Sequence, residues 1–172
     1  TIQLFDPQAR LQALLHRGQG LEAIPCAVVH PCDAESLRGA VDAARLDLIV
    51  PWLIGPETRL RAIAEAAGID LHGMKIQTVE HSHAAAELAA QLAADKKVLA
   101  MMKGSLHTDE LIHAVLAQPR LRTGRRMSHV FHFDVPAYAK PLLLTDAALN
   151  ITPTLSEKMD ILQNAIDFAH IM

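Results

Sequence analysis

The chain has 172 residues, enough for one domain or for one domain and part of a second. Hydrophobic residues make up 51% of it, charged residues 20% and aromatic residues only 3%, so a core must be built mainly from Ala, Leu, Ile and Val, which favours layered α/β packing over a large β-sandwich. The formal net charge of −3 argues against a nucleic-acid-binding protein, and no apolar run free of charge reaches the length of a membrane span.

Short apolar runs alternate with amphipathic helical stretches through most of the chain. Asp6-Pro7 predicts an N-cap followed by Pro at the first helical position, and Asp33 predicts the N-cap of the next helix. The expected order is helix 6–17, strand 26–30, helix 33–44, strand 48–54, helix 58–67, strand 75–79, helix 83–94, strand 98–102 and helix 108–116. Strands that alternate with helices of this length predict βαβ units and an α/β fold, a three-layer open parallel sheet with helices on both faces.

The pattern changes after Gly124. Segments 127–135 and 141–145 are predicted as two strands without a helix between them, and a helix follows from about residue 155 to the end. We therefore expect a first α/β domain over 1–124 and the beginning of a second α/β domain over 125–172. A start at Thr1 and a last helix without a C-cap signal are typical of a piece of a longer protein.

The cysteines and histidines favour a cytoplasmic protein without a metal. A disulfide between Cys26 and Cys32 is one alternative, but two cysteines without a secretory signal indicate a reducing compartment and favour buried or half-buried thiols. His129 and His132 lie three apart on a predicted strand and face opposite sides, and no Cys/His set has zinc spacing. A Gly-rich dinucleotide fingerprint is also missing after the first strand.

Polar residues follow several of the predicted strands, where open α/β sheets bind ligands. The segment His30-Pro31-Cys32-Asp33 reads either as a turn with an N-cap or as part of such a site. Gly104 permits a tight turn after the fourth strand, and the helix that begins near Thr108 offers free N–H groups and a positive dipole end to an anion. A plain N-cap role for Thr108 is compatible with the same pattern. The predicted phosphate contacts in this segment are Lys103, Gly104, Ser105, His107 and Thr108.

A second group of candidates lies after Gly124. Arg125 and Arg126 suit bidentate capture of phosphate, although a solvated basic loop is the competing interpretation. Ser128 and Asn150 are predicted as further phosphate or acyl phosphate contacts. Asp146, which follows an apolar strand, is the only candidate for a catalytic base.

Four motifs, read in order, carry a family resemblance. They are His30-Pro31-Cys32-Asp33 with Ser36-Leu37, and the segments 101–111, 122–131 and 145–153. Together they resemble the phosphate acetyl/butyryltransferase family, and the segments KGSLHTDEL and GRRMSHVF resemble its butyryl-type branch more closely. The acetyl-type branch has an arginine in the helix after the His-Thr motif, where this sequence has Ile112. The resemblance therefore implies that the duty of that arginine falls elsewhere, such as on the cluster 122–126.

The resemblance implies the reaction acyl-CoA + phosphate = acyl phosphate + CoA, with CoA as a substrate and no permanently bound cofactor. It also implies an isocitrate dehydrogenase-like two-domain fold with a cleft between the domains, and homodimers or larger assemblies. Some family members carry the acyltransferase behind a hydratase-like domain. The family's C-terminal segment supplies a catalytic Asp and further Ser and Arg contacts that this sequence lacks, so we expect the chain alone to be inactive.

Two other classes of function fit the same residues. One is a related enzyme, either an acyl-carrier-protein:phosphate acyltransferase or a dehydrogenase of similar fold, and the dehydrogenase would bind NAD(P). The other is a regulatory module that binds CoA or phosphate without catalysis. The sequence leaves the length of the acyl group open.

Overall fold

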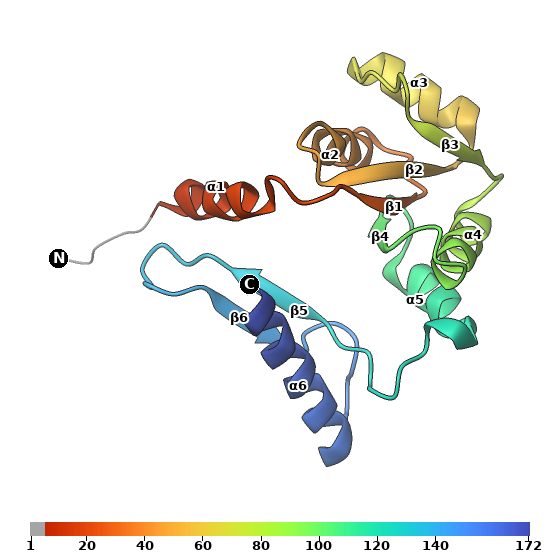
Figure 1. Ribbon diagram of the computed structural model, residues 1–172. Coiled ribbons are helices and arrows are strands. Elements are labelled where there is room, and N and C mark those ends of the chain that lie inside the picture. The colour runs from red at the N-terminus through yellow and green to blue at the C-terminus, as the bar shows by residue number, and fades with distance from the viewer. Residues whose placement is uncertain (1–5) are drawn as a thin grey trace. The chain divides into compact units, whose positions relative to one another are not determined.

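The computed structural model describes residues 6–172 and groups them into two compact units. One unit is Gln19–Arg122, and the other combines the described part of Thr1–Gly18 with Thr123–Met172 (Figure 1). The first helix of the chain therefore belongs with the C-terminal residues and not with the sheet that follows it. The expected division into domains 1–124 and 125–172 stays a prediction.

A parallel sheet of four strands forms the centre of the Gln19–Arg122 unit, in the order β3-β2-β1-β4. The strands are β1 (Ile24–Val29), β2 (Ile49–Gly55), β3 (Lys75–Thr78) and β4 (Ala100–Lys103). Val29 of β1 lies opposite Ile54 of β2 and, on its other side, opposite Lys103 of β4. The carboxyl ends of these three strands therefore meet at one edge of the sheet.

Helices cover both faces of this sheet (Figure 1). Helices α2 (Ala34–Arg45) and α3 (Glu57–Ala67) pack on one face, and α4 (Ser82–Ala94) and α5 (Thr108–Ala117) on the other; the short 3-10 helix η1 (Pro119–Leu121) follows. Because successive strand residues point to opposite faces, Val28 joins the core beneath α2 and α3, whereas Val29 joins the core beneath α4 and α5. The predicted three-layer α/β fold is confirmed.

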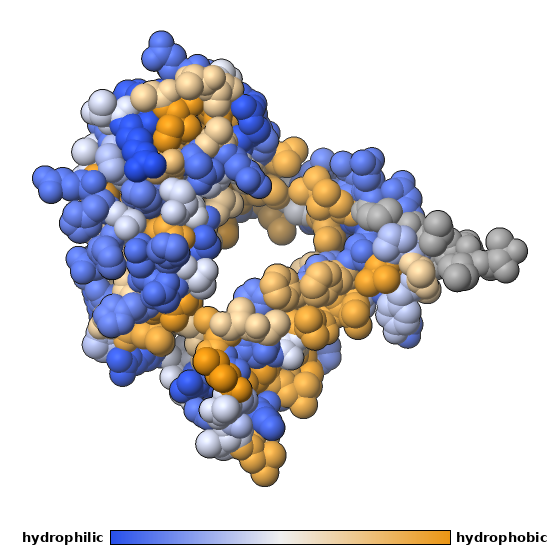
Figure 2. Space-filling view, turned by 180° about the vertical axis from the view of Figure 1, so that it is seen from behind, coloured by the Kyte–Doolittle hydropathy of each residue, from blue (hydrophilic) through white to orange (hydrophobic). Residues whose placement is uncertain are grey.

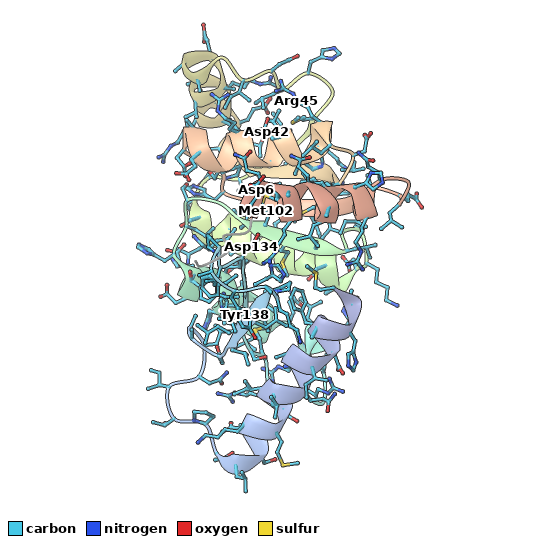
Figure 3. All side chains as sticks on the ribbon, turned by 90° about the vertical axis from the view of Figure 1, so that its left-hand side faces the viewer. Asp6, Asp42, Arg45, Met102, Asp134 and Tyr138 are labelled. Carbon is cyan, nitrogen blue, oxygen red and sulfur yellow. The ribbon has the colours of Figure 1, made fainter. Side chains whose placement is uncertain are left out.

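Small side chains let α4 lie close to the sheet. Its inward face is built from alanines that are almost completely buried, namely Ala85, Ala86, Ala89 and Ala90. On the other face, Asp33 begins α2 as predicted, because its carboxylate accepts a hydrogen bond of 2.8 Å from the N–H of Ser36. Asp42 and Arg45, labelled in Figure 3, form an exposed ion pair of 3.6 Å further along the same helix.

The order of the strands creates a point where the chain reverses its direction across the sheet. Helices α2 and α3 carry the chain outward from β1 to β2 and β3, and α4 then brings it back over the other face to β4. Since β4 pairs with the free edge of β1, the reversal lies between these two strands. Ligands of open α/β sheets bind outside the carboxyl ends of the strands at such a topological switch point.

The second unit contains an antiparallel hairpin and two helices. Strands β5 (Val130–Phe133) and β6 (Leu142–Thr145) pair with Val130 opposite Thr145, and α6 (Leu155–Ile171) follows them. Thr154 and Glu157 form a reciprocal capping box at the start of α6. Helix α1 (Pro7–Gly18) begins as predicted, because the Asp6 carboxylate accepts a hydrogen bond of 2.9 Å from the N–H of Gln8.

Arg10 attaches α1 to the loop of the hairpin. Its guanidinium pairs with the carboxylate of Asp134 and donates to the carbonyl oxygens of Tyr138 and Ala139, at 3.2 and 3.0 Å. Figure 3 labels Asp134 and Tyr138, two of the three residues that Arg10 contacts. These bonds explain why the first helix is grouped with the C-terminal residues.

One face of the hairpin is apolar and exposed. Phe131 lies opposite Leu144 and Phe133 opposite Leu142, and each of these four side chains is between 41% and 47% exposed. Hydrophobic residues accordingly gather on the surface of this unit (Figure 2). Among the helices that the structure describes, none is long and apolar enough to cross a membrane.

Candidate functional site

The carboxyl ends of β1 and β4 bring together the loops that begin at His30 and at Gly104. The N–H of Gly104 donates to the carbonyl oxygen of Val29 at 2.8 Å, and the N–H of Ser105 donates to that of His30 at 2.9 Å. Two of the segments singled out in the sequence are therefore in direct contact at the switch point. We call residues 30–33 and 103–108 the switch-point cluster.

Gly104 is required for a reason other than the one predicted. A Cβ atom at this position would lie 2.5 Å from the carbonyl oxygen of His30 and 2.6 Å from that of Val29. Many tight turns need a glycine because one residue has a positive φ. Gly20, Gly68 and Gly73 have a positive φ, and Gly104 does not. Glycine is thus needed here because two backbone segments approach each other closely.

The hydroxyl of Ser105 joins the two loops. Its Oγ donates to the carbonyl oxygen of His30 at 2.9 Å and accepts from the N–H of Cys32 at 3.1 Å. The sequence predicts Ser105 as a phosphate contact, and that contact stays a prediction. In the structure the hydroxyl proton is already used to hold the two loops together.

His30 is the one residue classed as buried and polar among those that the structure describes, with 9% of its surface exposed. It adopts a φ of 53°, which is uncommon outside glycine and asparagine, and its Nδ1 lies 3.4 Å from Ser105 Oγ. Burial lowers the pKa of the imidazole, and the charges of Arg59 and His81 lower it further, whereas Glu110 opposes them. This lowered pKa favours the neutral form of the ring.

Lys103 folds over its own loop. Its ammonium group donates to the carbonyl oxygens of Gly104 and Leu106, at 3.1 and 2.9 Å. The pKa of the Asp33 carboxyl is lowered mainly by the hydrogen bond from the N–H of Ser36. The positive charge of Lys103 lowers it further. A positive charge therefore lies at the carboxyl edge, as a phosphate site requires.

The start of α5 has free donors and nearby acidic residues. His107 is the N-cap without a side-chain cap, so the predicted alternative of an N-cap at Thr108 is wrong, and Thr108 is the first helical residue. Within residues 6–172, the N–H groups of Thr108, Asp109 and Glu110 have no hydrogen-bond acceptor. Asp109 and Glu110 already place negative charge in this first turn, which offsets part of its attraction for an anion.

The second group of predicted site residues lies in the other unit and is held together by polar bonds. Arg126 donates through Nε to Asn150 Oδ1 at 2.7 Å and forms an ion pair of 3.2 Å with Glu157. Arg125 forms an ion pair with Asp167 on α6. Both guanidinium groups are about half exposed, so a phosphate would have to compete with these carboxylates for them. Phosphate binding by Arg125 and Arg126 stays a prediction.

Asp146 organises the turn that follows β6. Its carboxylate accepts from the N–H groups of His129, Ala148 and Leu149, at 3.3, 3.2 and 3.1 Å, and from the amide of Asn150. Burial raises the pKa of this carboxyl, but the hydrogen bonds together outweigh burial and hold it below the usual value. An ionised carboxylate surrounded by donors is a poor proton acceptor, so the geometry favours a structural role for Asp146 over that of a base.

Ser128 and Asn150 also have partners of their own. The amide of Asn164 on α6 donates to Ser128 Oγ at 2.8 Å, and the amide of Asn150 donates to the carbonyl oxygen of Met127 at 3.0 Å. A shallow hollow of about 290 Å³ lies beside this network and is lined by Thr145, Asp146, Asn150, Pro153, Lys158, Ile161 and Leu162. Asn150 is the predicted phosphate contact that faces it.

Cysteines and metal-binding clusters are the remaining groups that could carry chemistry. Both cysteines are free and buried, and burial raises the pKa of each thiol. Over the described residues, no group of three or more His, Cys, Asp and Glu side chains is arranged to hold a metal ion.

Sequence reasoning missed Arg59 and Glu110 as neighbours of His30. Arg59 Nη2 donates to the carbonyl oxygen of Cys32 at 3.4 Å from the first turn of α3. The sequence does contain a signal for Arg59, because it lies shortly after the carboxyl end of β2, next to β1 in the sheet. Asn164 was missed as well, since only the folded chain brings α6 to Ser128.

The fold is an open parallel α/β sheet, and the candidate site lies at its topological switch point, beside the carboxyl ends of β1 and β4. The family model described as "Phosphate acetyl/butaryl transferase" matches residues 82–172, which include the loop 103–108 and the whole hairpin and α6. The chain belongs to this family.

Named relatives agree with the family, and a solved structure agrees with the fold. The chain is 51% identical to the phosphate acetyltransferase of Rickettsia prowazekii over 170 residues, covering 98% of this chain and 48% of that protein. It is 33% identical to the phosphate butyryltransferase of Clostridium acetobutylicum over 139 residues, covering 80% and 46%. A phosphotransacetylase structure from Streptococcus pyogenes matches with a TM-score of 0.81 at 16% identity, covering 97% of this chain and 59% of that chain.

Two consequences follow from these numbers. The chain spans about half the length of the curated relatives it matches. The sequence motifs predicted that the chain is closer to the butyryl-type branch, and this prediction is wrong. The chain is 51% identical to the Rickettsia acetyltransferase and 33% identical to the clostridial butyryltransferase.

Proposed function

We propose that the protein to which this chain belongs is a phosphate acyltransferase. It moves a short-chain acyl group between CoA and inorganic phosphate, in the reaction acyl-CoA + phosphate = acyl phosphate + CoA. The observation that carries the proposal is the loop 103–108, which lies inside the family match and at the topological switch point. CoA and phosphate are substrates in this proposal, and no cofactor is bound permanently.

The chemistry of the reaction explains the kind of groups found here. Phosphate and the acyl oxyanion need cations and free N–H donors, which the ammonium of Lys103 and the first turn of α5 offer. Arg125 and Arg126 add planar guanidinium groups that suit bidentate contact with phosphate. The proposed phosphate-binding residues are Lys103, Gly104, Ser105, His107, Thr108, Arg125, Arg126, Ser128 and Asn150.

The setting of the enzyme is part of the same proposal. The free cysteines fit a cytoplasmic, reducing compartment. The exposed apolar face of the hairpin supports assembly into a homodimer or larger homo-oligomer. Fusion behind a hydratase-like domain remains a prediction from the resemblance.

The test is a thiol-release assay on the full gene product, at whatever length the gene encodes. With acetyl-CoA or butyryl-CoA, we expect release of free CoA that requires inorganic phosphate. We expect the 172-residue chain alone to show negligible turnover, since it spans about half of its relatives. CoA release that is independent of phosphate, or no release with any short-chain acyl-CoA, would contradict the proposed function.

A calorimetric titration separates the competing classes. A phosphate acyltransferase is expected to bind acetyl phosphate and CoA and to give no heat with NAD. A dehydrogenase of related fold would instead bind NAD. A regulatory module would bind CoA or phosphate and show no turnover in the thiol-release assay.

A further inference from the structure

We propose that Arg59, in the first turn of α3, is an anion-binding residue of the switch-point cluster and holds the phosphoryl oxygens of a substrate. The proposal rests on the proposed function for the identity of the substrates, because CoA and acyl phosphate both carry phosphoryl groups. The phosphate contacts predicted in the Gln19–Arg122 unit lie at 103–108 and contain no guanidinium, which Arg59 supplies.

Two segments that are distant in the sequence meet at Cys32. Arg59 Nη2 donates to the carbonyl oxygen of Cys32 at 3.4 Å, and the N–H of Cys32 donates to Ser105 Oγ at 3.1 Å. The guanidinium and the loop 103–108 therefore contact the same residue, one through its carbonyl oxygen and the other through its N–H. This places Arg59 beside the loop that the sequence predicts as a phosphate site.

The charge of Arg59 acts on two groups of the cluster. Burial lowers the pKa of the His30 imidazole, and the positive charge of Arg59 lowers it further. Burial raises the pKa of the Cys32 thiol, and the same charge opposes this rise. Both effects are those of a positive potential at the loop 30–33, which also attracts an anion.

The guanidinium of Arg59 has most of its donors unused within residues 6–172. An arginine has five N–H donors, and the bond from Arg59 to the loop 30–33 is longer than the usual N–H···O range. Other arginines of the described chain, such as Arg10, Arg61 and Arg126, form ion pairs with carboxylates. Among residues 6–172, no carboxylate lies within ion-pair distance of Arg59.

The acidic residues closest to Arg59 along the chain and at the cluster are bound to other groups. Glu57, two residues earlier on α3, accepts from Arg61 at 2.8 and 2.6 Å and from a hydroxyl of β3 at 3.0 Å. Asp33, at the start of α2, accepts from the N–H of Ser36 at 2.8 Å. The charge of Arg59 therefore has no fixed counter-ion in the described chain, and a planar guanidinium in this state suits bidentate contact with a phosphoryl group.

The test is calorimetric titration of the full gene product with inorganic phosphate, acetyl phosphate, CoA and dephospho-CoA, which lacks the phosphate on the ribose. We expect Arg59→Gln to weaken binding by about ten- to a hundredfold, as for the loss of charge-assisted hydrogen bonds. Arg59→Lys keeps the charge without the planar fork, so its loss should be smaller. Arg61→Gln is the matched control, because its guanidinium is bound to Glu57 on the same helix, and it should bind as the parent does.

The pattern of losses identifies the phosphoryl group. Weaker binding of inorganic phosphate and acetyl phosphate assigns Arg59 to the transferred phosphate. Weaker binding of CoA with unchanged dephospho-CoA assigns it to the ribose phosphate, and equal weakening of both assigns it to the diphosphate. Equal affinities of the parent and Arg59→Gln for all four probes overturn the proposal.

Kinetics and thermal unfolding of the same variants separate binding from a structural role. We expect Arg59→Gln to raise KM for the ligand whose affinity it loses, and to unfold at the temperature of the Arg61→Gln control. A lower kcat with unchanged KM and affinities, or a lowered unfolding temperature with equal losses for every probe, overturns the binding role. If the parent binds inorganic phosphate through Arg59 but releases no CoA, the proposed function fails and the anion site stands. If the parent binds none of the four probes, both fail.

Discussion

The two compact units differ in how completely they bury their own apolar side chains. In Gln19–Arg122, the sheet is covered on both faces, and residues such as Leu53 and Val28 are fully buried. In the unit with Thr123–Met172, α6 packs against β6, and the hairpin leaves Phe131, Phe133 and their partners about half exposed. The first unit therefore has a core that can stabilise itself, whereas the second depends more on capping and ion pairs.

The difference also separates two kinds of candidate site. The switch-point cluster rests on backbone bonds between two strand ends, which a buried sheet holds in place. The arginine group of the second unit rests on exposed side-chain bonds to α6. Sites on rigid elements position chemistry more precisely than sites on exposed side chains do, so the switch-point cluster is the better-held of the two candidate sites, and phosphate contact at either stays a prediction.

The largest expected effect is the loss of a buried side chain from the first unit. Leu53→Ala removes a fully buried side chain and should lower the free energy of unfolding by about 2–5 kcal/mol. Leu144→Ala on the hairpin should cost well under that, because its side chain is 47% exposed. Urea unfolding followed through Trp52, the single tryptophan, reports the Gln19–Arg122 unit, and far-UV circular dichroism reports the helices and strands of both units. Equal losses in the two variants would contradict the contrast between the units.

The next effect concerns the close approach at Gly104. Gly104→Ala places a Cβ against two carbonyl oxygens and should cost about 1–3 kcal/mol, as overpacking does. Gly124→Ala in the other unit is the matched control, since its Cβ would have nothing within 4 Å, and a change within about 0.5 kcal/mol is expected. A Gly104→Ala variant as stable as the parent would mean that the β1 and β4 loops separate more easily than the structure indicates.

The smallest effect is that of the α2 cap. Asp33→Ala should cost about 1 kcal/mol near neutral pH, because the N–H of Ser36 loses its acceptor. The folded-state pKa of Asp33 lies below the unfolded value of 3.8, so this stabilisation is complete above that value and is lost as the pH falls through the folded pKa. Unfolding curves of parent and variant should therefore converge in strong acid.

Asp42→Ala is the control on the same helix. Its ion pair with Arg45 is exposed and should contribute at most a few tenths of a kcal/mol. A difference between parent and Asp33→Ala that persists unchanged into strong acid would show that the carboxylate is not the source of the cap's stabilisation.

Local patterns predicted the elements well, because caps and apolar runs act over a few residues. Asp6, Asp33 and the continuous apolar run of β1 all formed the structures expected of them. The reason for Gly104 could not be predicted, because it depends on β4 pairing with β1 across about seventy residues of chain. The partners of Arg125, Arg126 and Ser128 lie on α6, and no local pattern shows which carboxylate or amide a distant helix will bring.

The site was predicted in part for the same reason. The sequence placed Lys103, Gly104 and Ser105 at a strand end, but left His30 open between a turn and a ligand edge. The contact of His30 with Ser105 and the electrostatic influence of distant charged groups on its imidazole arise only when the sheet folds.

Amide hydrogen exchange of the full gene product, with and without acetyl phosphate and CoA, tests most directly whether substrates act at the switch-point cluster. The N–H groups of Thr108, Asp109 and Glu110 have no acceptor in the described chain, so a bound phosphate should slow their exchange markedly. Residues 30–33 should gain protection with them, and the loop at 71–74 between α3 and β3 should not change. Unaltered exchange at 103–110 under saturating substrates would contradict the account.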